Sequence, residues 1–110
     1  MNHEITLEMA IDMTTLYRNN MPADYPICET FDATAIERLL ATPGAVSLRI
    51  YYGLKEAGTM HAILVAVDSN GNDLLPQQPS SFAQNQQDPV ILEDSFRCPP
   101  TCPPDSPLNT

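Results

Sequence analysis

The sequence predicts an α+β fold in which two N-terminal helices pack on a small antiparallel β-sheet of three or four strands, followed by a proline-rich C-terminal tail. Three observations predict this fold. Apolar residues recur at helical spacing in the first forty residues, they follow strand spacing from residue 45 to residue 75, and eight of the eleven prolines lie from Pro76 onward. We therefore expect an α+β body at residues 1–75, a flexible polar loop at 76–89, and a strand with a Pro/Cys-rich tail at 90–110 that docks on the body or on a neighbour.

Residues 5–19 predict the first helix. Thr6 is placed to cap it, and Asn19 and Asn20 favour a turn at its end. The helix carries a broad apolar stripe that we expect to pack against the body, formed by Leu7, Met9, Ala10, Ile11, Met13 and Leu16. Two prolines then predict an irregular connector at residues 21–30.

Residues 33–41 predict the second helix. The Asp32 carboxylate can accept hydrogen bonds from the first-turn amides, while Phe31 and Ile36 have the spacing of a hydrophobic staple. The inner face of this helix would be Ile36, Leu39 and Leu40. The helix is expected to end at the Thr-Pro-Gly sequence of residues 42–44, because proline cannot continue the helical hydrogen bonds.

The sheet is expected from residue 45 onward. Residues 45–54 alternate, so Tyr52 lies on a face that should anchor the core, while Arg49 and Tyr51 share the other face. Residues 60–67 are apolar on both faces and predict the central strand. Turns at residues 55–59 and 68–72 would join these strands to each other and to a third strand from residue 73.

The C-terminal third predicts little regular structure. Residues 76–89 are rich in Gln, Ser, Asn and Pro with one aromatic residue, Phe82, and such a composition buries too little surface to become ordered. An apolar group at residues 90–92, with Phe96, would add a last strand. Residues 97–104 then predict an extended, polyproline-like end.

Charge and composition exclude several classes of partner. Fourteen acidic residues against five basic ones give a net charge of −9, which repels phosphate backbones and anionic membranes, so we expect no nucleic acid and no membrane as partner. The N-terminus shows no secretory signal, and no window has the eighteen or more apolar residues of a membrane span. We expect a cytoplasmic protein whose three cysteines are mostly thiols.

The cysteines are the candidate metal ligands. Cys28, Cys98 and Cys102, together with His61 or His3, would supply the Cys₃His set that tetrahedral zinc accepts, and zinc is the one cofactor that the sequence suggests. The spacing lacks the paired knuckles of most structural zinc sites. A disulfide between Cys98 and Cys102 is the other possibility. An extended chain would hold their Cα atoms about 12 Å apart, so a disulfide needs a turn at residues 99–101.

No motif predicts an enzyme. Glycine-rich phosphate loops and metalloprotease histidine pairs are missing from the sequence, and a Cys28 or Cys98 nucleophile with His61 as its base lacks any nucleophile turn. The acidic stretch at residues 68–73 resembles a calcium-binding loop, but its glycine is fourth rather than sixth. We therefore expect a hairpin turn there.

The sheet face that carries Arg49 and Tyr51 is the predicted interaction surface. Tyr and Arg are enriched at protein interfaces, and helices that cover only the Tyr52 face would leave this face exposed. The C-terminal tail would also contribute residues to this interaction surface. The predicted protein interface comprises Arg49, Tyr51, Ile63, Val65, Ile91 and Phe96. The alternative is that the tail folds back and covers this sheet face.

The expected function is therefore non-enzymatic assembly. The chain would be an acidic accessory or assembly protein that binds a protein partner or copies of itself as a homo-oligomer. One alternative is a small zinc-binding module that uses Cys28, Cys98 and Cys102. A weaker alternative is an acidic inhibitor that mimics nucleic acid and binds a basic protein.

Four segments carry a resemblance to a known family. They are residues 48–54, residues 63–75, the Cys-Pro-Pro-Thr-Cys sequence at 98–102 and the Pro-Leu-Asn sequence at 107–109. Together they resemble a family of short uncharacterised bacterial proteins, over most of residues 5–109. The resemblance implies a bacterial origin. It implies no catalytic or ligand-binding residue, because the family has no assigned activity.

Overall fold

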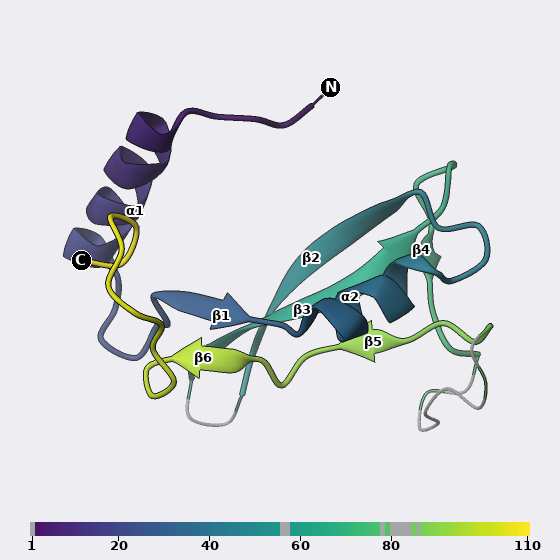
Figure 1. Ribbon diagram of the computed structural model, residues 1–110. Coiled ribbons are helices and arrows are strands. Elements are labelled where there is room, and N and C mark those ends of the chain that lie inside the picture. The colour runs from purple at the N-terminus through teal and green to yellow at the C-terminus, as the bar shows by residue number, and fades with distance from the viewer. Residues whose placement is uncertain (1, 56–57, 78, 80–84, 86) are drawn as a thin grey trace.

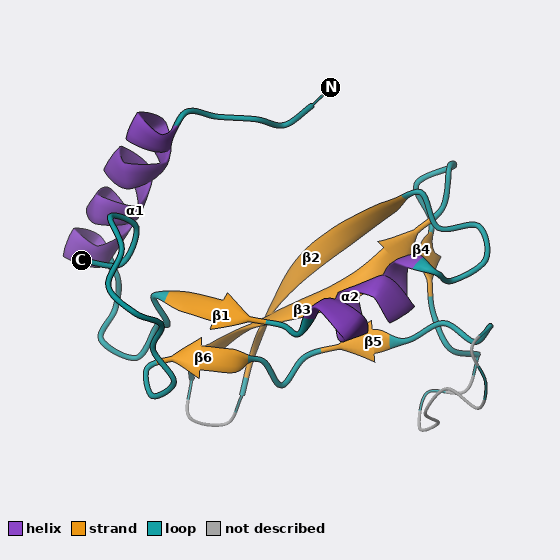
Figure 2. Ribbon diagram, in the orientation of Figure 1, coloured by secondary structure: helices purple, strands orange, loops and turns teal. Residues whose placement is uncertain are grey.

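The computed structural model describes residues 2–55, 58–77, 79, 85 and 87–110, and this part of the chain has the α+β composition that the sequence predicts (Figures 1 and 2). The elements are, in chain order, α1 (Leu7–Asn20), β1 (Cys28–Thr30), α2 (Ala33–Leu40), β2 (Ser47–Leu54), β3 (Met60–Val67), β4 (Asp73–Leu74), β5 (Ile91–Leu92) and β6 (Phe96–Cys98). In this part of the chain no helix is long and apolar enough to cross a bilayer.

Two antiparallel sheets form. The larger has four strands, with β3 between β2 on one side and both β4 and β5 on the other, which confirms residues 60–67 as the central strand. The β2–β3 hairpin is in register from Ser47 opposite Val67 to Leu54 opposite Met60. The smaller sheet pairs β1 with β6 and places Cys28 opposite Cys98.

The core lies between α2 and β3. Leu39 of α2 is fully buried against Leu64 and Ala66, and both residues of the predicted staple, Phe31 and Ile36, pack around them. The Asp32 side chain makes no hydrogen bond to the helix, contrary to the prediction. Its backbone carbonyl instead accepts hydrogen bonds from the amides of residues 35 and 36, which leaves the carboxylate in solvent. The cluster under α2 is small, and Val65 and Val67 are buried on the opposite face of β3.

The α1 helix does not pack on the sheet as expected. Thr6 caps it as predicted, by accepting a hydrogen bond from the Met9 amide, but none of the helix residues is buried. Its apolar residues divide between two sides of the helix, so neither side has a stripe wide enough to dominate. Polar contacts hold it instead. Tyr17 donates to the carbonyl of Pro26, and the Arg18 guanidinium donates to the carbonyl of Leu108 in the tail, each at 2.6 Å.

Two strand predictions need correction. The predicted connector at residues 21–30 contains a strand, β1, which is too short for its alternation to be recognised in the sequence. Tyr52 was expected in the core, yet it is 73% exposed. Tyr52 shares the α2 side of the sheet with Leu64 and Ala66, but α2 covers the β3 half of that side and leaves the β2 half open.

The Asp68–Asn72 turn is the hairpin turn that the sequence predicts. A hydrogen bond from the Asp68 amide to the Asn72 carbonyl closes the turn. Gly71 adopts a φ of +84°, a value that favours glycine. The Asp68 carboxylate accepts from the amides of Asn72 and Asn70 at 2.9 Å each. These bonds, the one from Asn72 first, lower the pKa of Asp68.

The tail turns back rather than running out as an extended polyproline segment. Cys98 and Cys102 form a disulfide with their Cα atoms 4.4 Å apart, so the prediction that the cysteines are mostly thiols holds only for Cys28. The required turn is closed by a hydrogen bond of 2.7 Å from the Thr101 amide to the Arg97 carbonyl. The segment after it lies beside α1 (Figure 1).

Half of the predicted flexible loop at residues 76–89, Phe82 included, lies outside the described residues. The end of this segment is bound to the body. The guanidinium of Arg38 in α2 donates to the carbonyls of Asn85 and Asp88, at 2.8 and 2.6 Å.

Candidate functional site

The most exposed apolar surface of the sheet follows β2. Its alternate side chains on the α2 side of the sheet are exposed, together with the residue before the strand: Val46, Leu48, Ile50, Tyr52 and Leu54. We call these five residues the β2 row. Large contiguous apolar patches on protein surfaces are typical of sites that bind a protein, a membrane or a ligand. The sequence placed these residues on one face but assigned that face to the core.

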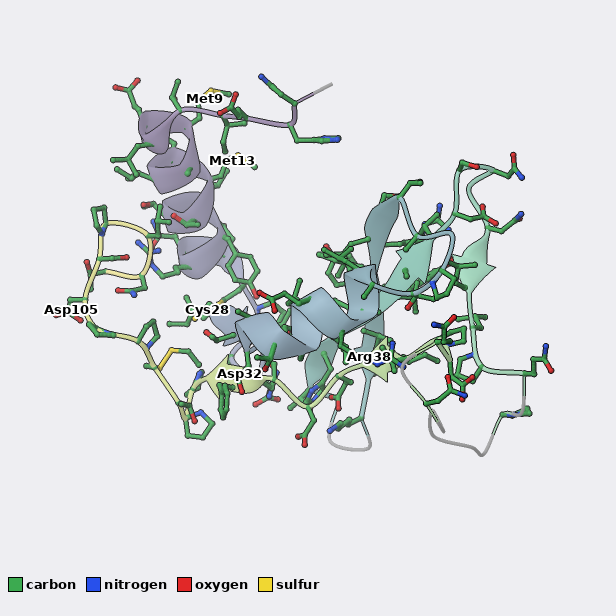
Figure 3. The ribbon with its side chains drawn as sticks, turned by 45° about the vertical axis from the view of Figure 1, so that its right-hand side comes forward. Met9, Met13, Cys28, Asp32, Arg38 and Asp105 are labelled. Carbon is green, nitrogen blue, oxygen red and sulfur yellow. A yellow bond between two sulfur atoms is a disulfide. The ribbon has the colours of Figure 1, made fainter. Side chains whose placement is uncertain are left out.

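A second exposed apolar group lies on α1. Met9, Met13 and Leu16 are spaced by four and three residues, which places them on one side of the helix, and all three are exposed. Figure 3 shows Met9 and Met13 on the same side of α1. Methionine is common on surfaces that adapt to a partner.

The opposite face of the sheet carries a polar cluster over β2 and β4. The two oxygens of Asp73 accept hydrogen bonds of 2.6 Å each, one from the Arg49 guanidinium and one from the Tyr51 hydroxyl. Arg49 also donates to the carbonyl of Gly71 at 3.2 Å. The Tyr51 hydrogen bond has the largest effect on the pKa of Asp73 and lowers it; desolvation opposes this effect, and Arg49 lowers the pKa further.

This cluster changes the predicted interface. Val65 lies opposite Arg49 and is only 3% exposed, so it is not available to a partner in this structure. Ile63 is half-buried and leans over Gly53, where any added Cβ would come within 2.9 Å of its Cδ1. Tyr51 is exposed but held by Asp73. The remaining two members of the predicted interface, Ile91 and Phe96, are about half exposed.

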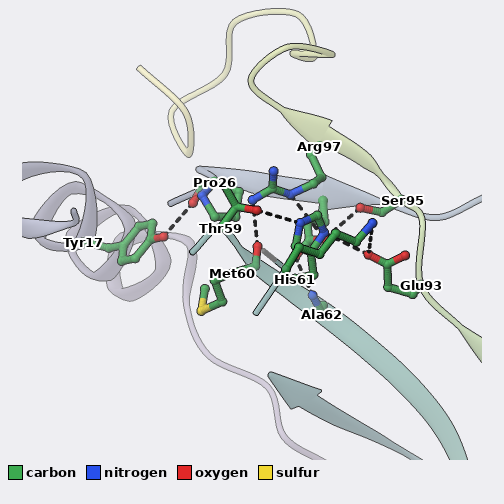
Figure 4. A network of polar contacts seen from close by, with 11 residues as sticks. Tyr17, Pro26, Thr59, Met60, His61, Ala62, Glu93, Ser95 and Arg97 are labelled. Carbon is green, nitrogen blue, oxygen red and sulfur yellow. Dashed lines mark hydrogen bonds and ion pairs between the residues drawn. The ribbon is translucent and has the colours of Figure 1, made fainter. Parts of the chain in front are cut away.

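A second polar cluster joins the two sheets (Figure 4). Glu29 of β1 accepts a hydrogen bond from the Ala62 amide of β3 at 3.0 Å and another from the Ser95 hydroxyl at 2.8 Å. Arg97 of β6 donates to the Met60 carbonyl at 2.7 Å. The two-stranded sheet is therefore tied to the edge of β3 through side chains rather than through a backbone ladder.

His61 lies in the same region and is 7% exposed. Its Nε2 is 3.0 Å from the Thr59 hydroxyl, and its Nδ1 is 2.9 Å from Glu93 Oε1. The second contact has the distance of an ion pair but not the geometry of a hydrogen bond. Burial raises the pKa of Glu93, yet Lys55, the Asp94 amide and His61 outweigh it and lower the pKa overall. These contacts fit a strand side chain that supports the sheet.

The predicted zinc ligands do not come together as thiolates. The disulfide uses Cys98 and Cys102, and a disulfide sulfur is not the thiolate that zinc requires. Cys28 lies across the ladder from Cys98, while His61 faces Glu93. Among the described residues, no group of three or more His, Cys, Asp and Glu side chains is arranged to hold a metal ion.

No protein-family model, curated protein or solved structure matches this chain. The resemblance to short bacterial proteins therefore stays a prediction.

Sequence reasoning missed the β2 row and the cluster around Glu29. The β2 row was identified as a face but placed in the core, because the alternation of a strand does not show how far a helix covers it. The Glu29 cluster joins residues of β1, β3 and the segment before β6, and no local pattern links those segments.

Proposed function

We propose that this protein is a non-enzymatic assembly protein that acts by binding a protein surface, either another copy of itself or a subunit of a larger complex. One observation carries the proposal. The chain exposes 8018 Å², whereas a folded monomer of 12.1 kDa exposes about 6,000 Å². The excess of about 2,000 Å² exceeds the roughly 800 Å² that each partner buries in a standard interface.

The radius of gyration and the distribution of buried side chains are both consistent with this excess of exposed area. The radius of gyration is 15.8 Å, against about 13 Å for a compact domain of this length. The buried apolar side chains of the described residues gather on α2, β3 and β6, while most large apolar side chains of α1 and β2 stay exposed. A partner that covers some of these side chains would supply the burial that the isolated chain lacks.

Two measurements test the proposal. Native mass spectrometry of the purified protein is expected to show an oligomer, and sedimentation of the protein in extracts of the cells that make it is expected to show a complex heavier than 12.1 kDa. A free monomer in both measurements would contradict the proposal.

The same spectra address the two alternatives. Zinc binding through Cys28, Cys98 and Cys102 requires that the disulfide is first reduced, so the reduced protein is the sample in which to look for a bound zinc mass. An acidic inhibitor would bind a basic protein with an affinity that falls steeply as salt is added.

The disulfide also bears on the expected cytoplasmic location. Disulfides persist in oxidising compartments and are rare in the cytosol. A cytoplasmic protein is therefore expected to have Cys98 and Cys102 as thiols in cells, which alkylation at the moment of lysis checks. An intact disulfide under those conditions would contradict the cytoplasmic location.

A further inference from the structure

We infer that the outer edge of β2 pairs with the β2 edge of a second copy of this chain, so that two four-stranded sheets join through one antiparallel strand pair. The inference rests on the proposed function and names its surface and its partner. It starts from the position of β2, an eight-residue strand at the end of the strand order β2-β3-β4. Every residue of this strand lies in the described part of the chain.

The hydrogen bonds of β3 show which backbone groups of β2 point away from β3. The Ala62 amide donates to Glu29 and the Met60 carbonyl accepts from Arg97, so neither group bonds to β2. In an antiparallel ladder, the residues opposite such positions also turn their own N–H and C=O outward. These outward residues are Leu48, Ile50, Tyr52 and Leu54. No hydrogen bond from within the described residues reaches their outward groups.

This edge lacks the features that keep the sheet edges of monomeric proteins from pairing. Such edges are short, or they carry proline or free charged side chains. The β2 strand is eight residues long and has no proline. Its one charged residue, Arg49, is bound to Asp73, and Lys55 just after the strand is paired with Glu93. The edge therefore favours strand addition.

The distribution of charge makes the β2 edge a part of the surface on which a second copy can dock without repulsion between carboxylates. The chain has a net charge of −9, so two copies repel each other over most of their surfaces. The β2 strand has no acidic residue, and its outward backbone groups belong to the exposed β2 row. In a two-fold antiparallel pair the strand meets itself, with apolar side chains beside apolar side chains and no opposed carboxylates.

The test compares the unmodified protein with two lysine variants. Ile50 of β2 and Met9 of α1 are each 50% exposed, so the two substitutions are matched in the exposure of the side chain that they replace. The unmodified protein is expected to sediment as a dimer. Ile50→Lys is expected to weaken the dimer at least about a hundredfold, because both copies lose an interfacial isoleucine and gain opposed charges. Met9→Lys is expected to leave the dimer unchanged, and circular dichroism checks that both variants fold.

Hydrogen exchange gives a second measurement that needs no variant. The amides of Leu48, Ile50 and Tyr52 are expected to exchange at least about tenfold more slowly at a concentration that populates the dimer than after dilution to monomer. The Tyr51 amide, which faces β3, serves as the internal control and is expected to be protected at both concentrations.

Three results would overturn the inference. The first is a purified protein that stays monomeric, the second is a dimer that Ile50→Lys leaves intact, and the third is a dimer that Met9→Lys weakens as much as Ile50→Lys does. None of these results alone overturns the proposed function. After the second or third result, the protein still associates, but through another surface. After the first result, the proposed function stands if the chain sediments within a heavier complex in extracts.

Discussion

Asp73 links two side chains of the β2 strand to the start of β4, and its ionisation state is open to direct measurement. Its pKa lies below the ordinary value of 3.8 because the carboxylate accepts hydrogen bonds from Tyr51 first and Arg49 next. Because the Asp73 pKa is lower in the folded than in the unfolded state, the ionised carboxylate stabilises the fold at pH values above the ordinary pKa. This contribution is lost as the pH falls through the lowered value. We therefore expect the free energy of unfolding to decline below about pH 4.

Tyr51→Phe tests the cause of that shift. It removes the largest contribution, so the Asp73 pKa is expected to rise toward 3.8, as read from the carboxyl carbon chemical shift against pH. Tyr52→Phe is the matched control, because Tyr52 points to the other face of the sheet and should leave the Asp73 titration unchanged. An unaltered midpoint in Tyr51→Phe would refute this account.

The sequence predicted half of this cluster. Alternation correctly placed Arg49 and Tyr51 on one face. It could not supply Asp73, because which residue of the returning strand meets them depends on the register of two hairpins.

At the scale of the elements, Glu29 is one of two side chains, with Arg97, that attach the β1–β6 sheet to β3. It is 11% exposed and accepts from a β3 amide and from Ser95. Glu29→Ala leaves both donors without this acceptor, so we expect the free energy of unfolding to fall by about 1–3 kcal/mol in urea titrations. Glu37→Ala, at an exposed glutamate of α2, is the control and is expected to stay within about 0.5 kcal/mol of the unmodified protein. Equal stabilities of the two variants would rule out this role for Glu29.

The elements also show where sequence prediction works. The second helix and the β2–β3 hairpin were predicted within a residue or two, because each has a local signal in a staple, an alternation or an apolar run. The β1 strand was missed since its three residues become a strand only by pairing with β6, far along the chain. The prediction that α1 packs on the sheet was also wrong. A helical period in the sequence does not show which surface the helix contacts.

For the molecule as a whole, the net charge of −9 opposes self-association at a distance, while the proposed contact strand is mainly apolar and has no acidic residue. Salt shortens the screening length from about 30 Å at 0.01 M to about 8 Å at 0.15 M. We therefore expect the dimer to tighten as salt is added over this range, as measured by sedimentation at several protein concentrations. Association that weakens with salt would instead indicate an electrostatic contact, as the acidic-inhibitor alternative requires.

The ladder of β1 and β6 leaves a free thiol directly across from one end of a disulfide, and this neighbourhood affects how the covalent structure can be measured. Cys28 and Cys98 are opposed, so their side chains lie on the same face of the small sheet. A Cys28 thiolate that attacks Cys98 would form a new bond to it and release Cys102 as the thiolate, with no net oxidation. The two isomers have identical mass. Intact mass therefore cannot tell them apart, and the native connectivity has to be read from peptides of an acid-quenched digest.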